Sequence, residues 1–358
     1  MAISRRDMVN FINLALMQKH KNKGRFRVTM ATKPIICLGI ESTAHTFGAS
    51  VMRDKAILSN VKKSFTSLEG GMVPHKVSDH HVEHCASIIQ EALHTANVKV
   101  QDLTLISFSQ SPGIGHMLRV GAGCARALAI LHNIPIIGVN HCVAHLEITG
   151  LLTPAKDPIL LYASGANTQI IAFMEGKYRV FGETLDMGIG NFLDTFARYA
   201  NLGFPGGPKI AELANQSQNY IELPYSVKGM DLHFGGMLTF LRQRLGVEEL
   251  NDLCYSVQET AFAMLCEVTE RALAHCNKTE VVLGGGVACN KRLQEMIRIM
   301  CEARGATLYT IPNEYYVDNA AMIAWLGILQ YQAGEQLEIA QCDIQPYVRT
   351  DDITVTWR

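Results

Sequence analysis

Two histidines four residues apart, His141 and His145, have the type and spacing that point most directly to chemistry in this chain. On a helix such residues lie one turn apart, so both imidazoles leave the same face and can bind one metal ion. Imidazole suits iron, zinc and neighbouring metals. In the zinc-protease helix H-E-x-x-H, the residue after the first histidine is the general base. Here that residue is Cys142, so the pair predicts a metal site of another kind, or two ordinary helix histidines.

Other residues of metal-binding type have ordinary explanations. His75, His80, His81 and His84 form a rival cluster, and His80 and His84 share the four-residue spacing. No nearby carboxylate or strand end converges on them, so a solvated helix face or the lining of a cleft explains them equally well. Asp318 starts a predicted helix, where an N-cap role is the usual one.

The elements that would position these residues form a repeat. In each half of the chain an apolar run typical of a buried strand leads through a small polar turn into a second apolar run, and a further strand-like segment follows. Such turns can hold a phosphate with backbone N–H groups, although a plain hairpin shows the same pattern. The segments are 35–40, 49–52 and 56–64 in the first half, and 159–163, 168–173 and 177–183 in the second.

Helix and strand patterns alternate over the rest of the chain. The run Gly284-Gly285-Gly286 separates a predicted strand from a predicted helix, where backbone can approach the flat face of a ligand such as adenosine. A glycine-punctuated turn at 186–194 enters a helix that Gly203 can cap, and residues 223–239 predict a ribbon and loop. The remaining predicted strands are 103–109, 134–139 and 281–283, and the remaining helices are 77–96, 118–132, 248–275 and 291–303.

The repeat predicts the fold class. We expect an α/β protein of two related domains of the actin, Hsp70 and hexokinase type (ASKHA), with facing hairpins and a nucleotide-binding cleft between them. The expected divisions are a basic extension outside the fold at 1–33, a first domain at 34–146, a second domain carrying the nucleotide site at 147–330, and a C-terminal segment at 331–358 that returns towards the first domain.

Composition narrows the function classes. With 358 residues, 48% of them hydrophobic, the chain can build a large core, and its net charge of -1 gives no overall basic field for nucleic acid. Ten cysteines without a C-x-x-C pair indicate reduced thiols in a cytoplasmic protein rather than a disulfide framework. No apolar run reaches the ~18–20 residues of a membrane span. The basic first thirty residues fit a disordered tail, a start codon upstream of Met30, or a transit peptide.

With these segments in order, the chain resembles the universal tRNA N6-adenosine threonylcarbamoyltransferase family, formerly described as O-sialoglycoprotein endopeptidase. The resemblance runs from about residue 35 to Trp357. The turn Glu41-Ser42-Thr43-Ala44-His45-Thr46, the closing segment 346–352 and Trp357 are similar to the archaeal and eukaryotic branch of the family, the catalytic subunit of the KEOPS complex.

The resemblance implies a set of site residues. His141, His145 and Asp318 would be metal ligands, with Tyr162 a fourth, for one divalent or trivalent ion, iron or zinc. The residues that would contact threonylcarbamoyl-AMP or its adenine nucleotide are Tyr162, Ala163, Ser164, Gly165, Ala166, Asn167, Asp194, Gly207 and Asn290, and further candidates are Glu41, Glu212 and Gly285.

Two positions depart from the pattern of the family. Ala166 stands where the second hairpin usually has a glycine, so a positive φ at this residue would be strained. Ala211 stands where the family commonly has an acid that binds ribose, and Glu212 lies one residue further along. The identity of the ribose-binding acid therefore stays open.

The resemblance also implies the reaction and its partners. The threonylcarbamoyl group would pass from threonylcarbamoyl-AMP to the N6 amine of the adenosine 3′ of the tRNA anticodon, position 37, in tRNAs that read ANN codons. The implied partners are tRNA, a small kinase-like ATPase and a small dimerising subunit, without a membrane.

Two other functions remain open at this point. An ATP-dependent binding module of the actin or Hsp70 kind would explain the hairpins but not the metal-type residues. A metalloprotease would explain His141 and His145, but it lacks the base and leaves three glycine-containing sites unexplained.

Overall fold

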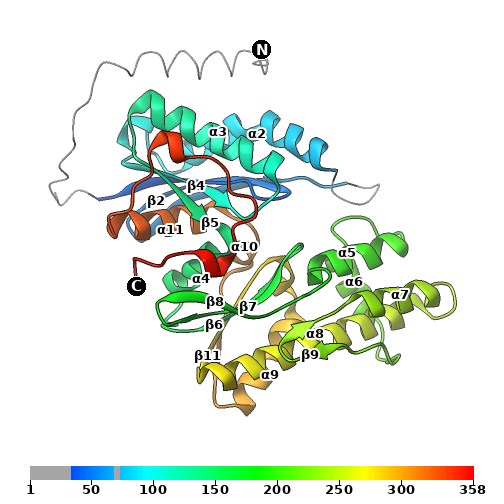
Figure 1. Cartoon of the computed structure of the whole chain (residues 1–358). Helices are drawn as coiled ribbons and strands as arrows, with labels where there is room; N and C mark the ends of the chain where they lie inside the picture. The colour runs from blue at the N-terminus through cyan, green and yellow to red at the C-terminus, as the bar shows by residue number, and fades with distance from the viewer. Residues whose placement is uncertain (1–33, 68–72) are drawn as a thin grey trace.

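Two five-stranded sheets with the same topology form the framework of the protein (Figure 1). The structure is a computed structural model that describes residues 34–67 and 73–358. In both sheets a three-stranded antiparallel meander continues into two strands that run parallel to its first strand. The first sheet has the order β3 (Ala56–Ser64), β2 (Thr46–Arg53), β1 (Ile36–Glu41), β4 (Leu105–Ser111) and β5 (Ile136–Asn140), and the second has the order β8 (Lys177–Glu183), β7 (Thr168–Met174), β6 (Ile159–Ala163), β11 (Glu280–Gly284) and β12 (Thr307–Tyr309).

The shared strand order confirms the predicted repeat and the α/β fold class. The central strands β1 and β6 are buried almost throughout, as continuous apolar runs require when helices cover both faces of a sheet. Because the connections are matched as well, the carboxyl ends of β1 and β6 occupy equivalent places in the two sheets.

Helices cover the sheets in layers (Figure 1). Helices α2 (Pro74–Thr95) and α3 (Gly115–His132) pack on the first sheet, and α4 (His141–Leu152) and α11 (Ala320–Gln332) lie between the two sheets. Helices α8 (Leu250–Cys276) and α9 (Lys291–Ala303) pack on the second sheet. The smaller elements beside the second sheet are α5 (Ile189–Tyr199), α6 (Gly207–Ala214), β9 (Val227–Lys228), β10 (Asp231–Leu232), α7 (Gly235–Arg244) and α10 (Asn313–Tyr316).

Glycines in the first sheet let the start of α11 approach closely. A Cβ atom at Gly39 would lie 2.4 Å from the carbonyl oxygen of Ala320 and 2.9 Å from the Cβ of Ala324, so only glycine fits there. On the neighbouring strand, a Cβ atom at Gly48 would lie 3.5 Å from the Cβ of Ala320. The first sheet therefore fixes the N-terminus of α11, and with it the segment immediately before this helix.

Two local predictions are wrong. Asp318 does not cap α11, because the side chain of Asn319 accepts the N–H of Met322 at 3.1 Å. Gly203 does not cap α5, which ends at Tyr199, and Asn201 has the left-handed conformation that follows the helix, with φ of 56°. In each case a neighbouring residue of suitable type performs the role.

The ribbon predicted within residues 223–239 is confirmed by the pair β9 and β10, although helix α7 already begins at Gly235. No helix among the described residues is long and apolar enough to cross a membrane.

The predicted domain boundaries stay predictions, and α11 bears on one of them. This helix packs against strands of the first sheet, so we propose to count it with the first domain although it precedes residue 331. The segment after α11 contacts both sheets: the N–H of Leu337 donates to Ile136, and Arg349 pairs with Glu183 at 3.2 Å. The predicted extension at 1–33 lies outside the described residues.

Candidate functional site

Helix α4 positions the two histidines of the predicted metal pair. The helix begins immediately after β5, and the side chain of Asn140 caps it by accepting the N–H of Val143 at 3.0 Å. His141 and His145 are 5% and 1% exposed. Two imidazoles one turn apart are thus held on one face of a helix that is buried between the sheets.

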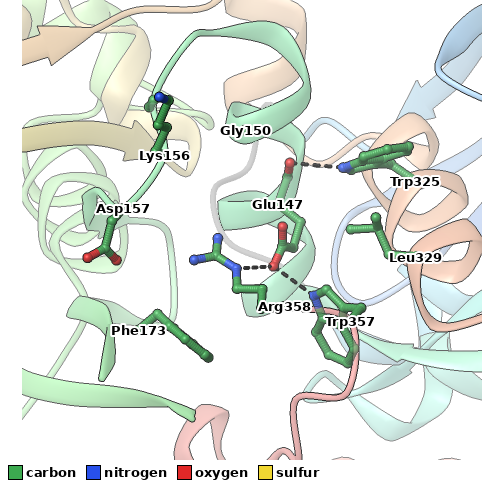
Figure 2. A pocket seen from close by; sticks show the side chains of 10 residues that line it. Glu147, Gly150, Lys156, Asp157, Phe173, Trp325, Leu329, Trp357 and Arg358 are labelled. Atoms are coloured by element: carbon green, nitrogen blue, oxygen red, sulfur yellow. Dashed lines mark hydrogen bonds and ion pairs between the residues drawn. The ribbon is translucent and has the colours of Figure 1, made fainter. Parts of the chain in front are cut away.

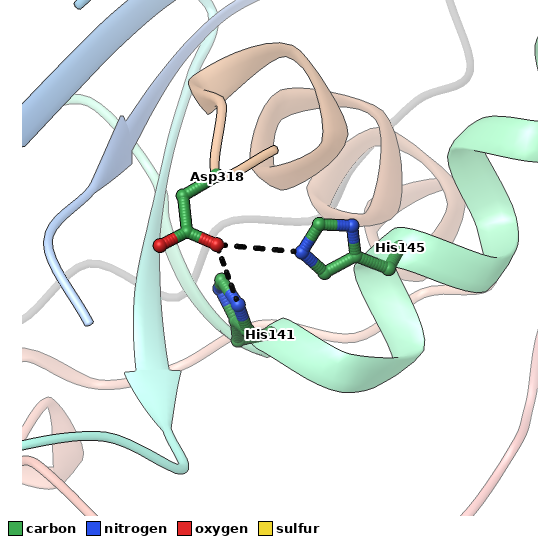
Figure 3. Close-up of side chains that lie close together, drawn as sticks. All are labelled: His141, His145 and Asp318. Carbon is green, nitrogen blue, oxygen red and sulfur yellow. Dashed lines mark ion pairs between the residues drawn. The ribbon is translucent and has the colours of Figure 1, made fainter. Parts of the chain in front are cut away.

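Asp318 lies opposite these imidazoles (Figure 3). Its Oδ1 atom is 3.4 Å from Nε2 of His141 and 3.6 Å from Nε2 of His145. The ligand atoms of the three residues all lie within 4.8 Å of one another. Tyr162, at the end of β6, places its hydroxyl 3.1 Å from Nε2 of His141. The structure therefore brings together all four residues that the resemblance implied as metal ligands.

The separations between these groups suit a shared cation. Donor atoms bound to one ion at ~2.1 Å lie roughly 3.0–3.5 Å apart in octahedral or tetrahedral geometry. The observed separations of 3.1, 3.4 and 3.6 Å are close to this range. Both ring nitrogens of His145 are buried without a hydrogen-bond partner, which is costly unless another group binds them. The donor set of imidazole, carboxylate and phenol fits iron or zinc.

Glu41 supports His141 from the side away from Asp318. This carboxylate is fully buried at the end of β1, and its Oε2 atom lies 3.0 Å from Nδ1 of His141. Its other oxygen accepts the backbone N–H of Thr43 at 2.7 Å. A carboxylate that accepts from Nδ1 leaves the Nε2 lone pair of His141 free to bind a metal. The structure thus places Glu41 behind the imidazole of His141, in a position that the sequence does not reveal.

The site keeps charged groups in spite of its burial. Burial alone would raise the pKa of Asp318, but its interactions with His141 and His145 hold it well below its usual range. Burial alone would lower the pKa of His141, whereas Glu41, Tyr162 and Asp318 raise it well above its ordinary value. Burial raises the pKa of Tyr162. A metal that binds here must therefore displace protons from His141 and Tyr162.

The second hairpin and the glycine turn lie directly beside this group. In the turn between β6 and β7, the N–H of Ser164 donates to Asn167 at 3.0 Å. Gly285 has φ of 87°, and a Cβ atom there would lie 2.4 Å from the carbonyl oxygen of Ala163. The glycine permits close contact between two backbone segments, and its contact with the flat face of a ligand stays a prediction. Ala166 is not among the described residues with positive φ, so the expected strain is absent.

The other nucleotide candidates surround α5, α6 and α9. Asp194 accepts the N–H of Gly206 at 2.7 Å, next to Gly207 at the start of α6. Asn290 caps α9, and its amide also donates to Gln258 at 2.9 Å. Glu212 lies on the exposed face of α6, where it pairs with Lys209 at 3.0 Å. Their contacts with a nucleotide stay predictions.

The rival histidine cluster does not form a comparable site. Among the described residues, the group of three or more possible ligands that meets at one point is His141, His145 and Asp318. His81 is fully buried and packs edge to face against Phe47, as a core residue does. Within the rival group, the rings of His80 and His84 pack edge to face, with their centroids 4.7 Å apart.

A cluster of interacting side chains around Glu147, on the other side of α4, was not predicted from the sequence (Figure 2). Glu147 accepts hydrogen bonds from Trp357 at 2.8 Å, from Arg358 at 3.1 Å and from Tyr178 of β8. The backbone carbonyl of Glu147 accepts from Trp325 of α11 at 3.0 Å. Glu147, Trp325, Trp357 and Arg358 border a pocket of about 520 Å³ that contains none of the predicted site residues. The group ties the histidine helix to β8, α11 and the C-terminal segment.

Comparison with known proteins identifies the family. The family model described as tRNA N6-adenosine threonylcarbamoyltransferase matches residues 56–325, which is more than half of the chain. The chain belongs to this family. A tRNA N6-adenosine threonylcarbamoyltransferase of Thermococcus kodakarensis is 52% identical over 90% of the chain and 100% of the relative. A relative of the same name from Methanococcoides burtonii is 47% identical over 89% of the chain and 96% of its own length. The chain is therefore an enzyme of the transferase class.

Longer proteins and solved structures are similar as well. A probable bifunctional tRNA threonylcarbamoyladenosine biosynthesis protein of Methanosarcina acetivorans is 50% identical over 91% of the threonylcarbamoyltransferase-family chain and 60% of its own length. The structure of HypF from T. kodakarensis matches 84% of the chain and 49% of HypF, with a TM-score of 0.60 and 14% identity. That similarity supports the predicted fold of the ASKHA type and carries no inference about function.

Proposed function

We propose that the enzyme transfers the threonylcarbamoyl group from threonylcarbamoyl-AMP to the N6 amine of adenosine 37 in tRNAs that read ANN codons. The observation that carries this proposal is the meeting of His141, His145, Tyr162 and Asp318 next to the β6–β7 hairpin. The four side chains could bind a metal ion, and the turn beside them could bind a phosphate. Together they suit a donor molecule that combines an amino acid with a nucleotide. Membership of the family supports both metal and nucleotide use.

The reaction needs positioning more than a strong nucleophile. The carbonyl carbon of the donor is already activated as a mixed anhydride with AMP. The N6 amine forms a new C–N bond with this carbon, the C–O bond to the phosphate breaks, and the amine loses one proton while AMP leaves. Holding the two reactants in place and stabilising the developing charge are therefore the main tasks of the protein.

The residues of the chain can divide these tasks. His141, His145, Tyr162 and Asp318 would hold one iron or zinc ion, which would supply a Lewis acid for the oxygen atoms of the threonyl moiety. The backbone of the turn at 164–167 would bind the phosphate, and Asp194, Gly207 and Asn290 would contact the ribose and base. Glu41 would accept the N–H of Nδ1 once a metal displaces the second proton of His141, and so would leave the Nε2 lone pair for the ion.

We also propose that the chain acts as the catalytic subunit of a KEOPS-type complex in the cytoplasm. The partners would be tRNA, a small kinase-like ATPase and a small dimerising subunit. The net charge of -1 supports a need for partners, because affinity for tRNA depends on neutralising its phosphates. All ten cysteines are free, which fits a reducing compartment.

The two rival functions are less well supported. A protease of the H-E-x-x-H type needs a base at position 142, and burial raises the pKa of the Cys142 thiol, so this side chain stays protonated. A nucleotide-driven binding module gives no reason for two buried imidazoles and a half-buried carboxylate to converge.

Nucleoside analysis tests the proposal directly. Unmodified tRNA is incubated with threonylcarbamoyl-AMP, the enzyme and its partner subunits, and the nucleosides are measured by mass spectrometry. We expect threonylcarbamoyladenosine with the wild type, none with His145→Ala, and a normal yield with His84→Ala as the matched histidine control. Full modification by His145→Ala would refute the role of the metal group. Turnover of ATP by the chain without any modified adenosine would favour the binding module.

A further inference from the structure

The loop that carries Asp318 is held by hydrogen-bond donors from both sheets. The backbone N–H of Gly285, from the glycine turn after β11, donates to the carbonyl of Tyr316 at 2.9 Å. The side chain of Asn319 donates to the carbonyls of Tyr315 and Val317 at 3.2 and 2.9 Å. We use the term loop here for residues 314–318, which run from the short helix α10 almost to the start of α11. The contacts above hold the middle of this loop but not its two ends.

Both ends of this loop contact one side chain of the first sheet. The ammonium of Lys62, on β3, donates to the carbonyl of Glu314 at 3.1 Å and lies 3.4 Å from the carbonyl of Asp318. An ammonium has three N–H donors on a compact head, so one lysine can bind two carbonyls at once. Lys62 therefore joins the first and last residues of the loop.

The neighbouring strand of the sheet leaves space for the side chain of Lys62 to extend to the loop. Lys62 is the register partner of Gly48 on β2, which has no side chain and lies next to Ala320 at the start of α11. The half-buried lysine thus extends from β3 towards the loop beside the helix N-terminus. Its neighbour Lys63 is exposed, and successive residues of a strand point to opposite faces of the sheet.

We propose that Lys62 is a positioning residue that holds Asp318 facing the imidazoles of His141 and His145. This inference rests on the proposed metal role of Asp318. The carboxylate of Asp318 lies 3.4 and 3.6 Å from the two imidazoles, so its direction depends on the backbone that carries it. Loss of the ammonium would leave two carbonyls without their donor and allow the end of the loop to rotate.

Metal affinity measured on three variants tests the inference. Lys62→Met removes the donors but keeps the length of the side chain, Lys62→Arg keeps donors, and Lys63→Met is the matched control on the same strand. Affinity for Co²⁺ is measured by competition with a chelator, and the visible absorption of bound Co²⁺ reports its coordination geometry. We expect Lys62→Met to weaken Co²⁺ binding by about 10–100-fold, as the loss of residues that orient metal ligands generally does.

The expected pattern has three further parts. Lys62→Met should change the Co²⁺ spectrum, Lys62→Arg should restore most of the affinity, and Lys63→Met should behave as the wild type. Unchanged affinity in Lys62→Met would overturn the inference. So would a large fall in the melting temperature of metal-free Lys62→Met without rescue by Lys62→Arg, because the lysine would then serve only the fold.

One more variant separates this inference from the proposed function. If His145→Ala binds Co²⁺ as tightly as the wild type, the proposed metal role itself fails, whatever the Lys62 variants do. If His145→Ala loses Co²⁺ while Lys62→Met keeps it, the metal role stands and only the positioning role of Lys62 is refuted.

Discussion

Replacing Glu41 by glutamine should place a proton on Nε2 of His141, the nitrogen whose lone pair would bind the metal. In the wild type, one oxygen of Glu41 accepts the N–H of Thr43 at 2.7 Å, and the other lies 3.0 Å from Nδ1 of His141. In Glu41→Gln the amide oxygen must still accept from Thr43, so the NH₂ group faces Nδ1. Two N–H groups cannot share a hydrogen bond, and His141 must therefore carry its proton on Nε2.

The size of the effect follows from the role of Nε2. This nitrogen is the one that faces Asp318 and Tyr162, so a proton there competes with the metal. Loss of a group that orients a metal-binding histidine generally weakens metal affinity by about 10–100-fold, or roughly 1.4–2.7 kcal/mol. The amide matches the carboxylate in size, so the buried position keeps its packing and the fold should persist.

Competition with a chelator, using Zn²⁺ and the metal-free protein, measures this change. Glu270→Gln is the control, because Glu270 pairs with Arg304 on the second sheet's helices, remote from the histidines. We expect Glu41→Gln to bind Zn²⁺ more weakly and Glu270→Gln to bind it normally, with similar melting temperatures. Equal Zn²⁺ affinity in Glu41→Gln and the wild type would refute the tautomer argument.

Four other outcomes are expected. Replacing both His141 and His145 by alanine should abolish metal binding, as measured by elemental analysis. The double variant should still melt cooperatively, because the two sheets keep their cores, and an unfolded double variant would contradict this. Metal affinity should rise as the pH increases above the ordinary titration range of histidine, because the raised pKa of His141 makes protons compete with the metal at lower pH, and a flat profile in chelator competition would exclude this competition. Gly285→Val should lower both the melting temperature and the affinity for AMP, since its side chain would collide with Ala163, and unchanged AMP affinity in calorimetry would refute the placement of the nucleotide. The chain alone should bind tRNA weakly and with a steep salt dependence, both at full length and when started at Met30, and tight binding at physiological salt would disprove the need for partners.

Sequence patterns predict the framework of the protein well where the physical signal is local. Apolar runs such as residues 159–163 become buried strands, and helix α9 has the predicted bounds 291–303. The repeat of strand, polar turn and strand predicts two sheets of the same topology, which the structure confirms. The four residues implied as metal ligands also come together, although their separation in the chain exceeds 170 positions.

The rest depends on contacts that no local pattern encodes. Asp318 and Asn319 are both good N-cap residues, and only the packing of α11 on Gly39 decides that Asn319 caps the helix. Glu41 is 100 residues from His141 in the chain, so its position behind the imidazole follows from the pairing of β1, β4 and β5. In the sequence, Lys62 looks like any other lysine of an edge strand.

The matched topology of the two sheets has an evolutionary consequence for the metal group. Glu41 and Tyr162 come from the equivalent central strands β1 and β6, and His141 and Asp318 follow the equivalent strands β5 and β12. An ancestor made of two identical copies of one such unit would have presented the same residues from both sides of a twofold axis. The two units now contribute different residues to the group, one the imidazoles and the other the phenol and the aspartate. Neither copy now holds a complete set of ligands, so an enzyme of this kind cannot shed one half without losing its site.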